Sequence, residues 1–213
     1  MKTILLKDAA ALIPDGASVM IGGFMGVGTP ARLMDELVRQ GKRNLTVIAN
    51  DTAMVGRGIG KLITAKLVRK VIASHIGLNP ETQQKMLSGE MEVELVPQGT
   101  LIERIRAAGY GLGGILTPTG IGTVVEQGKR KLEVDGREYL LETPLAADFA
   151  LVEAFLADYL GNLTYALTAR NFNPVIAMAA KTVIVDAPNA GYGLQLRKIL
   201  LQHGLRADRD YTL

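Results

Sequence analysis

The chain has 213 residues, of which 48% are hydrophobic and none is cysteine, and its formal net charge is +3. This apolar content is enough for the core of one α/β domain, and the lack of cysteine excludes thiol nucleophiles, thiolate metal sites and disulfides. Basic residues are spread along the chain and aromatic residues make up only 5%, so we expect no nucleic-acid partner. The apolar run Ile4–Leu6 stops at Lys7, too early for a signal peptide or a membrane span, which predicts a cytoplasmic protein without a membrane contact.

Residues 15–30 read as a buried strand, a glycine-rich loop and the start of a helix. Val19–Ile21 form an uninterrupted apolar run, and Pro30 suits the first turn of a helix, where a backbone N–H has no partner to lose. Glycines at 22, 23, 26 and 28 leave no Cβ in the way of a ligand, and we expect them to point unpaired N–H groups outward at the positive end of the helix dipole. The natural occupant of such a loop is a phosphate-bearing cofactor.

Apolar runs and helical patterns then alternate, which predicts βαβ units and a mostly parallel sheet. Gly41 is expected to cap the first of these helices in the left-handed conformation, and Asn79 and Pro80 to start a later one. The expected elements are a helix over 30–39, a strand over 45–49, a helix from 80 to about 88 and a strand over 92–96.

The exit of the strand 92–96 carries a candidate site residue. Thr100 and Glu103 have the spacing of a capping box, which predicts a helix over 101–108. Gln98 and Gly99 would then lie in the turn at the carboxyl end of the strand, the edge where open α/β sheets bind their ligands.

The second half of the chain is less regular. Glycine-rich loops are expected over 109–122, and Asp135-Gly136 predicts a type I′ hairpin. Strands are expected over 149–155 and 183–185.

The residues alone nominate neither a metal site nor a nucleophile. His75 is interpreted as a residue at the edge of the core, and neither His75 nor His203 has the spacing of a metal ligand. Glu126, Glu133 and Glu153 are expected on solvated faces.

The glycine-rich segment resembles, position for position, the first signature of the family I coenzyme A transferases. The matching residues are Asp15, Gly16, the aliphatic Val19–Ile21, Gly22, Gly23, Phe24, Gly28 and Pro30. Further resemblance runs through residues 48–51, 74–77, 87–90, 96–100, 116–123 and 169–173. The resemblance covers about the first 185 residues. Within the family, the chain is most similar to the α subunits of the bacterial acetate/acetoacetate type.

The resemblance implies a three-layer α/β/α fold with a mostly parallel sheet, as in the NagB/RpiA-like proteins, over residues 1–185. It implies an enzyme that moves CoA between an acyl-CoA and a short-chain carboxylic acid, such as acetate or acetoacetate, by a ping-pong mechanism. The nucleophile of the family is a glutamate in a Ser-Glu-Asn-Gly motif of the β subunit, and this chain has no such motif. The chain is therefore expected to be half of an enzyme, in an α2β2 assembly, with CoA as a substrate and not as a bound cofactor.

By resemblance, Gln98 is the expected catalytic residue of this chain, a donor to the oxyanion beside the partner's glutamate. The residues expected to line the CoA site are Gly22, Gly23, Phe24, Met25, Gly26, Val27 and Gly28. For the glycines, a tight turn that needs them only for steric reasons is the alternative. The loops from Gly111 to Gly122 could line the CoA site or contact the β subunit.

Two other functions stay open at this point. Gly26-x-Gly28-x-x-Ala31 also fits a dinucleotide-binding fingerprint, with Asp51 about 20 residues further on, which would suit a Rossmann-type oxidoreductase. A non-catalytic acyl-CoA-binding module is the second alternative. Residues 186–213 depart from the family pattern and are expected to form a separate tail, with a packing helix over 194–203.

Overall fold

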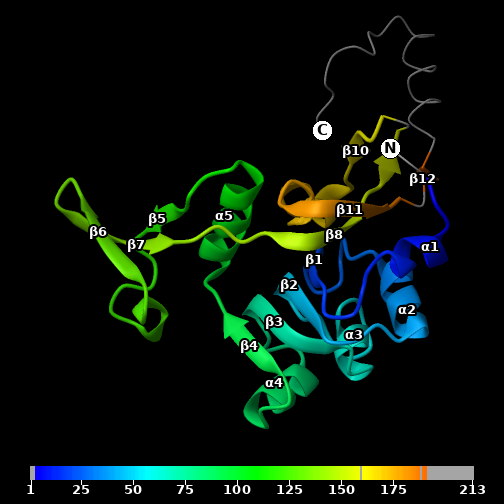
Figure 1. Cartoon of the computed structure of the whole chain (residues 1–213), viewed down its shortest axis with the longest axis horizontal. Coiled ribbons are helices and arrows are strands. Elements are labelled where there is room, and N and C mark those ends of the chain that lie inside the picture. Colours follow the sequence, from blue (N-terminus) through cyan, green and yellow to red (C-terminus); the bar gives the residue numbers. More distant parts are fainter. Residues whose placement is uncertain (1–2, 159, 188, 191–213) are drawn as a thin grey trace, which may run out of the picture.

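The computed structural model describes residues 3–158, 160–187 and 189–190 (Figure 1). The expected tail helix and His203 lie outside these residues. The main element is a six-stranded sheet in the order β11-β8-β1-β2-β3-β4, in which every neighbouring pair is parallel. Its strands are β1 (Ser18–Ile21), β2 (Leu45–Asp51), β3 (Val68–His75), β4 (Glu92–Leu95), β8 (Ala147–Glu153) and β11 (Ala180–Asp186).

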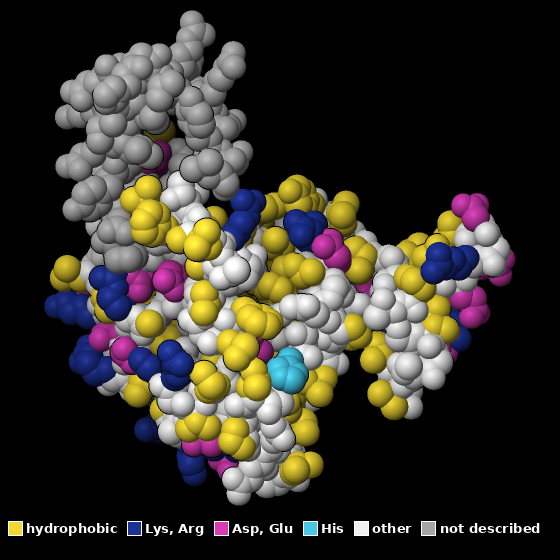
Figure 2. All heavy atoms as spheres, turned by 180° about the vertical axis from the view of Figure 1, so that it is seen from behind, with side chains coloured by type: hydrophobic (Ala, Val, Ile, Leu, Met, Phe, Trp, Pro, Cys, Tyr) yellow, Lys and Arg dark blue, Asp and Glu magenta, His cyan; other side chains and the backbone are white. Residues whose placement is uncertain are grey.

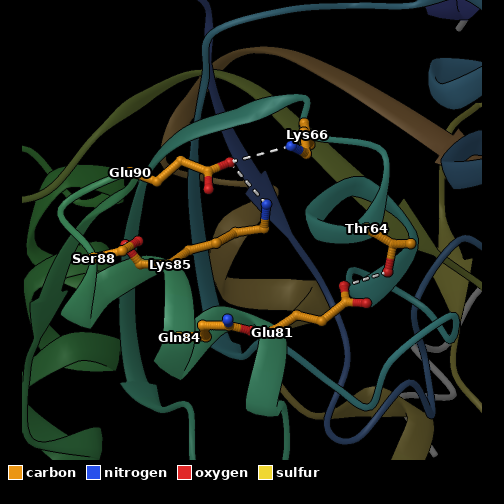
Figure 3. Close-up of a pocket in the computed structure, with 7 residues that line it drawn as sticks. All are labelled: Thr64, Lys66, Glu81, Gln84, Lys85, Ser88 and Glu90. Carbon is orange, nitrogen blue, oxygen red and sulfur yellow. Dashed lines mark hydrogen bonds and ion pairs between the residues drawn. The ribbon is translucent and has the colours of Figure 1, made fainter.

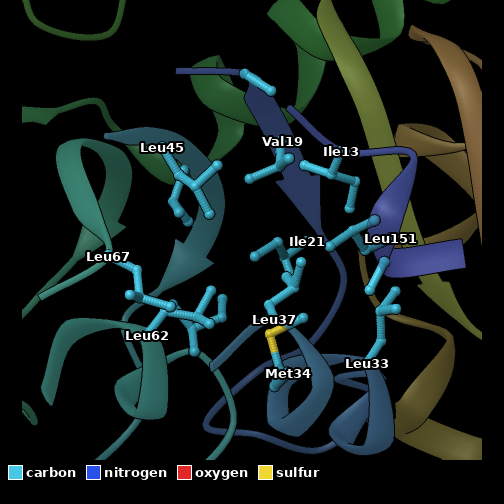
Figure 4. Close-up of a cluster of buried hydrophobic side chains, with 14 of the residues drawn as sticks. Ile13, Val19, Ile21, Leu33, Met34, Leu37, Leu45, Leu62, Leu67 and Leu151 are labelled. Atoms are coloured by element: carbon cyan, nitrogen blue, oxygen red, sulfur yellow. The ribbon is translucent and has the colours of Figure 1, made fainter. Parts of the chain in front are cut away.

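Helices cover both faces of this sheet, so the expected three-layer α/β/α fold is confirmed. Alternate residues of β1 point to opposite faces: Val19 and Ile21 pack into one hydrophobic cluster, and Met20 packs into another. Figure 4 shows the first cluster, to which α2 contributes Leu33, Met34 and Leu37. This face carries α1 (Leu6–Ala11), α2 (Ala31–Gln40), α3 (Gly60–Thr64) and α4 (Pro80–Leu87), and the opposite face carries α5 (Gln98–Gly109) and α6 (Asn173–Ile176).

Local signals place several elements as predicted. Gly41 ends α2 with φ of 64°, a left-handed conformation that glycine adopts without steric cost. Asn79 caps α4, because its side chain accepts a hydrogen bond from Thr82 N. Asp135 and Gly136, with φ of 50° and 72°, join β6 (Arg130–Val134) to β7 (Arg137–Glu142) in the predicted hairpin.

That hairpin belongs to an arm that projects from the body of the molecule (Figure 1). With β5 (Ile115–Thr117) it forms an antiparallel sheet in the order β5-β7-β6. Charged side chains of both signs lie toward the far end of the arm (Figure 2). Lys131 of β6 pairs with Glu126 of the short helix η1 (Val124–Glu126). A third small sheet joins β9 (Leu156–Ala157), β10 (Leu163–Thr164) and β12 (Asn189–Ala190), and η2 spans Leu167–Arg170.

The predicted capping box at the start of α5 is wrong. The helix begins at Gln98, because Pro97 is the N-cap residue and its carbonyl accepts the first helical hydrogen bond, from Leu101 N at 2.8 Å. Thr100 is buried, and its Oγ1 has no hydrogen-bond partner within the described part of the chain. Glu103 instead binds Arg106 Nε at 3.0 Å. Gln98 is thus the first residue of the helix and does not lie in a preceding turn.

In the described part of the chain, the helices are all too short or too polar to cross a membrane.

Candidate active site

The polar residues of the candidate site meet where four parallel strands end. The glycine-rich loop follows β1, Asn50 and Asp51 end β2, Ser74 lies next to the end of β3, and Gln98 follows β4. Carboxyl ends of parallel strands share one edge of a sheet, which is the edge where α/β folds bind ligands. The structure thus brings Gln98 and the glycine-rich loop, the two expected parts of the site, to the same edge.

The glycine-rich loop is a tight hairpin formed by residues 24–27. Phe24 and Val27 exchange two backbone hydrogen bonds of 2.9 Å each, and Met25 and Gly26 form the tip with φ of 51° and 88°. Two successive positive φ values are what a type I′ turn requires. The side chains of Phe24, Met25 and Val27 remain 37–52% exposed, so the hairpin presents apolar surface.

The loop amides do not point outward as predicted. Gly22 N donates to Leu151 O at 3.1 Å, Gly23 N to Asn171 Oδ1 at 3.0 Å, and Met25 N to the Asp51 carboxylate at 3.0 Å. The amides of Phe24 and Val27 form the hairpin itself. The expectation that the glycines point free N–H groups outward is therefore wrong for Gly22 and Gly23, because a neighbouring strand and a distant loop supply their acceptors. The part of the loop in CoA binding stays a prediction.

The protein's own packing explains three of the glycines. An ideal Cβ on Gly22 would lie 1.9 Å from Asn173 Oδ1, and one on Gly23 would lie 2.0 Å from Thr29 Oγ1. On Gly28 it would lie 2.5 Å from the carbonyl oxygen of Ala169. Gly26 differs, since a Cβ there would meet nothing within 4 Å, and only its φ of 88° favours glycine.

Two asparagines fasten the hairpin to the rest of the site. Asn171 Nδ2 donates to Val27 O at 2.9 Å, while its Oδ1 accepts from Gly23 N. Asn173 is fully buried, and its Nδ2 donates to Gly28 O at 2.9 Å. The sequence pattern over 169–173 pointed to this segment, but spacing alone gave no reason to pair it with a loop more than 140 residues earlier.

Gln98 is exposed, and its side-chain amide is held by a hydrogen-bonded chain. Gln98 Nε2 donates to Asn50 Oδ1 at 2.6 Å, and Asn50 Nδ2 donates to Asp51 Oδ2 at 2.8 Å. Ser74 Oγ donates to the backbone carbonyl of Asn50 at 2.7 Å. Asn50 and Asp51 are buried, so this network links an exposed amide to the interior of the protein. Asn50 had no assigned role in the sequence analysis.

The position of Asp51 argues against the dinucleotide-binding alternative. In a Rossmann fold the acidic residue at the end of the second strand binds the ribose hydroxyls of the cofactor. Here the Asp51 carboxylate is buried and accepts hydrogen bonds from Met25 N, Ala53 N and Asn50 Nδ2. Both carboxylate oxygens accept hydrogen bonds from protein groups and do not face a ligand.

The remaining titratable residues give a mixed result. His75 ends β3 and is exposed, and the described residues contain no group of three His, Asp or Glu side chains that could hold a metal ion. Glu133 is exposed as predicted, and Glu126 is half-buried. The expectation for Glu153 is wrong: it is half-buried beside Asp186 of the neighbouring strand β11. Burial, and then the charge of Asp186, raise the pKa of the Glu153 carboxyl.

A surface groove between α3 and α4 lies at the opposite edge of the sheet (Figure 3). It is lined by Thr64, Lys66, Glu81, Gln84, Lys85, Ser88 and Glu90. Lys66 precedes β3 and Glu90 precedes β4, which places the groove at the amino ends of the strands. Both lysines already pair with Glu90, at 3.9 and 3.0 Å, so the groove offers little free positive charge to a phosphate.

Comparison with known proteins places the chain among CoA-dependent enzymes. The model of the coenzyme A transferase family matches residues 3–190. The chain is 62% identical to the acetate CoA-transferase subunit alpha of Escherichia coli K12, over 87% of this chain and 84% of that protein. It is 54% identical to the acetoacetyl-CoA:acetate/butyrate CoA transferase alpha subunit of Clostridium acetobutylicum, over 88% of this chain and 86% of that protein.

A solved structure gives the same assignment of fold. An acyl-CoA transferase from Escherichia coli O157:H7, determined as a thioester complex with CoA, superposes with a TM-score of 0.72 and 26% identity. The match covers 87% of this chain but only 43% of the other. This chain thus corresponds to less than half of the matched chain.

Proposed function

The chain belongs to the coenzyme A transferase family, and we propose that it is the α subunit of a short-chain acyl-CoA:carboxylate CoA-transferase of the acetate/acetoacetate type. The observation that carries the proposal is the presentation of the exposed Gln98 amide, held by Asn50, at the sheet edge that also carries the glycine hairpin. The names of the two α-subunit relatives support acetate and acetoacetyl-CoA as the first substrates to test.

We further propose that a separate β subunit completes the site. The sequence pattern nominates no nucleophile on this chain, and the relatives that match most of its length are named α subunits. A β subunit with a Ser-Glu-Asn-Gly motif would supply the glutamate, in an α2β2 assembly. This division would account for a chain that spans less than half of the matched acyl-CoA transferase chain.

In the proposed reaction, the partner's glutamate attacks the carbonyl carbon of the acyl-CoA thioester, and the C–S bond breaks to release CoA thiolate. This gives an acyl-glutamyl anhydride. The thiolate then attacks the glutamyl carbonyl, releases the first acid as its carboxylate and leaves a glutamyl-CoA thioester. The acceptor carboxylate repeats the two steps in reverse, so no proton or electron is gained or lost in the cycle.

Gln98 would stabilise the oxyanion that forms in each attack. Its Nε2 carries two protons, and the bond to Asn50 Oδ1 occupies one of them. The second is available to an oxyanion at the exposed side of the residue. A fixed donor of this kind contributes about 3 kcal/mol to the transition state, because it needs no reorientation when the charge develops.

The hairpin would contact CoA through its apolar side chains, since most of its amides bind the protein itself. Phe24, Met25 and Val27 offer exposed surface that suits the flexible pantetheine arm of CoA. Asp51 and Asn171 hold the hairpin from two sides and would keep this surface in place.

The test is transfer of CoA from acetyl-CoA to acetoacetate, followed by the absorbance of acetoacetyl-CoA. It compares this chain alone, the chain co-expressed with a partner bearing Ser-Glu-Asn-Gly, and the same complex with Gln98→Ala. We expect activity only in the complex, and about 10²- to 10³-fold lower kcat in the variant. A stable complex that transfers no CoA, or full activity of this chain alone, would contradict the proposal.

A further inference from the structure

The network behind Gln98 has a defined direction, which is set at Asp51. A carboxylate only accepts hydrogen bonds, whereas an asparagine or glutamine amide presents a donor on one side and an acceptor on the other. Asp51 Oδ2 faces the Asn50 side chain at 2.8 Å, so the Asn50 group turned toward it must be the NH2. The Asn50 oxygen then faces Gln98, and the Gln98 group turned toward Asn50 must be its NH2, at 2.6 Å.

We propose that Asp51 is a positioning residue of the transferase, which fixes the orientation of the Gln98 amide through Asn50. The proposal rests on the proposed function of Gln98 as an oxyanion donor. Asp51 does not reach the reacting atoms, because it is 4% exposed and its carboxylate binds Asn50, Met25 N and Ala53 N. Its role is to determine which atom of Gln98 lies on which side.

The same carboxylate also fixes the hairpin. Asp51 accepts from Met25 N at 3.0 and 3.3 Å, and from Ala53 N at 2.7 Å, where the backbone has a φ of 53°. The buried Asp51 carboxylate therefore positions both the tip of the proposed CoA-binding hairpin and the Gln98 amide, the proposed donor to the oxyanion. The hairpin tip and the Gln98 amide are thereby held in a fixed position relative to each other.

Asp51→Asn tests the direction of the network with almost no change in shape. The Oδ1 of the new asparagine can still accept from Ala53 N. Its NH2 takes the place of Oδ2 and then faces two donors, the NH2 of Asn50 and Met25 N. Two donors cannot share a hydrogen bond, so the Asn50 amide must turn over, and Gln98 must turn over in response. We expect about 10²-fold lower kcat from the misplaced donor, and a higher KM for acetyl-CoA because the bond that holds the hairpin at Met25 N is weakened.

A double variant restores the direction. In Asn50→Asp with Asp51→Asn, the new asparagine donates to the new carboxylate, which accepts from Gln98 Nε2 as Asn50 Oδ1 does now. The double variant has the same net charge and composition as the wild type. We expect its kcat to recover to within about tenfold of the wild-type value, while Asn50→Asp alone, with two adjacent carboxylates, should not recover it.

The matched control is Asp35→Asn, which makes the same chemical change at an exposed residue of α2 that pairs with Lys61. It should leave kcat unchanged. Thermal unfolding of each complex separates positioning from folding: a purely structural role of Asp51 predicts that activity follows stability in all variants. Recovery of kcat in the double variant without recovery of the unfolding temperature would support positioning.

A second measurement does not depend on turnover. In a 15N-labelled complex, the side-chain NH2 signals of Gln98 are identified by their loss in Gln98→Glu. They should shift in Asp51→Asn and return in the double variant. If the wild-type complex transfers no CoA, the proposed function fails, and these signals still decide the direction of the network. Unmoved Gln98 signals in Asp51→Asn, or a double variant as impaired as the single one, would overturn the proposal.

Discussion

The contact between Gly22 and Asn173 predicts a strong coupling between two residues far apart in sequence. The backbone φ of Gly22 lies outside the left-handed region, so alanine at this position is hindered only by its neighbours. Its Cβ would lie 1.9 Å from Asn173 Oδ1 and 2.5 Å from Cγ, so the Asn173 amide must move by more than an ångström. That movement breaks the bonds of Asn173 to Gly28 O, Ala169 O and Glu153 N.

The size of the effect follows from these contacts. Overpacking costs about 1–3 kcal/mol. Loss of hydrogen bonds to buried backbone groups costs about 1–3 kcal/mol each, with the lower end expected where a shifted side chain or water compensates. We therefore expect Gly22→Ala to lower the free energy of unfolding by about 4–6 kcal/mol. Asn173→Ala removes the same three bonds and should cost a similar amount.

The informative measurement is a double-mutant cycle by equilibrium urea unfolding, followed by circular dichroism. In the Asn173→Ala background the clash at Gly22 disappears, so the double variant should be no less stable than Asn173→Ala alone. Gly26→Ala is the matched control, because its Cβ meets nothing and only the left-handed φ costs about 1–2 kcal/mol. If the losses of unfolding free energy in Gly22→Ala and Asn173→Ala were additive in the double variant, contact with Asn173 would not be the reason that position 22 requires glycine.

Two further predictions concern the hairpin and the half-buried Glu153. Asn171→Ala removes the bonds to Gly23 N and Val27 O; we expect at least tenfold faster hydrogen exchange of the Gly23 amide and a higher KM for acetyl-CoA, and unchanged exchange would contradict the role of Asn171 in holding the hairpin. Burial beside Asp186 raises the pKa of Glu153, so the folded state holds its proton more tightly and loses stability as pH rises above the unfolded pKa. Glu153→Gln should therefore raise the unfolding temperature at pH 7 but not at pH 4, and a gain of equal size at both pH values would refute this cause.

Much of the fold was predictable because it depends on local signals. Val19–Ile21 form a continuous apolar run since β1 is buried on both faces, and Gly41 and Asp135-Gly136 end or turn the chain by backbone preferences of their own. The capping box at Thr100 failed because two local signals competed there. Pro97 is the N-cap residue in place of Thr100, so the helix starts three residues earlier than the box would start it.

The sequence pointed to the parts of the candidate site but not to the contacts that connect them. Gln98 and the glycine loop were found by resemblance, and the sheet topology brings them to one edge. The bond between Gln98 and Asn50 joins residues 48 apart, and that between Asn171 and Gly23 joins residues 148 apart. No periodicity or spacing encodes such pairs. Glu153 was misplaced for the same reason, since its burial depends on a neighbouring strand that begins 27 residues later.

The burial of Asn50 and Asp51 is itself an argument for function. Buried polar groups at a strand end contribute little net stability, because each bond they make replaces one to water. An apolar pair at the same positions would fill the space, but it could neither hold Gln98 nor accept from Met25 N and Ala53 N. A polar network that runs from the interior to one exposed amide has a use where that amide must keep a single orientation. Under the proposed function, the Gln98 amide is the one that would face the oxyanion, and it would need to be held before the partner's glutamate and the acyl-CoA arrive.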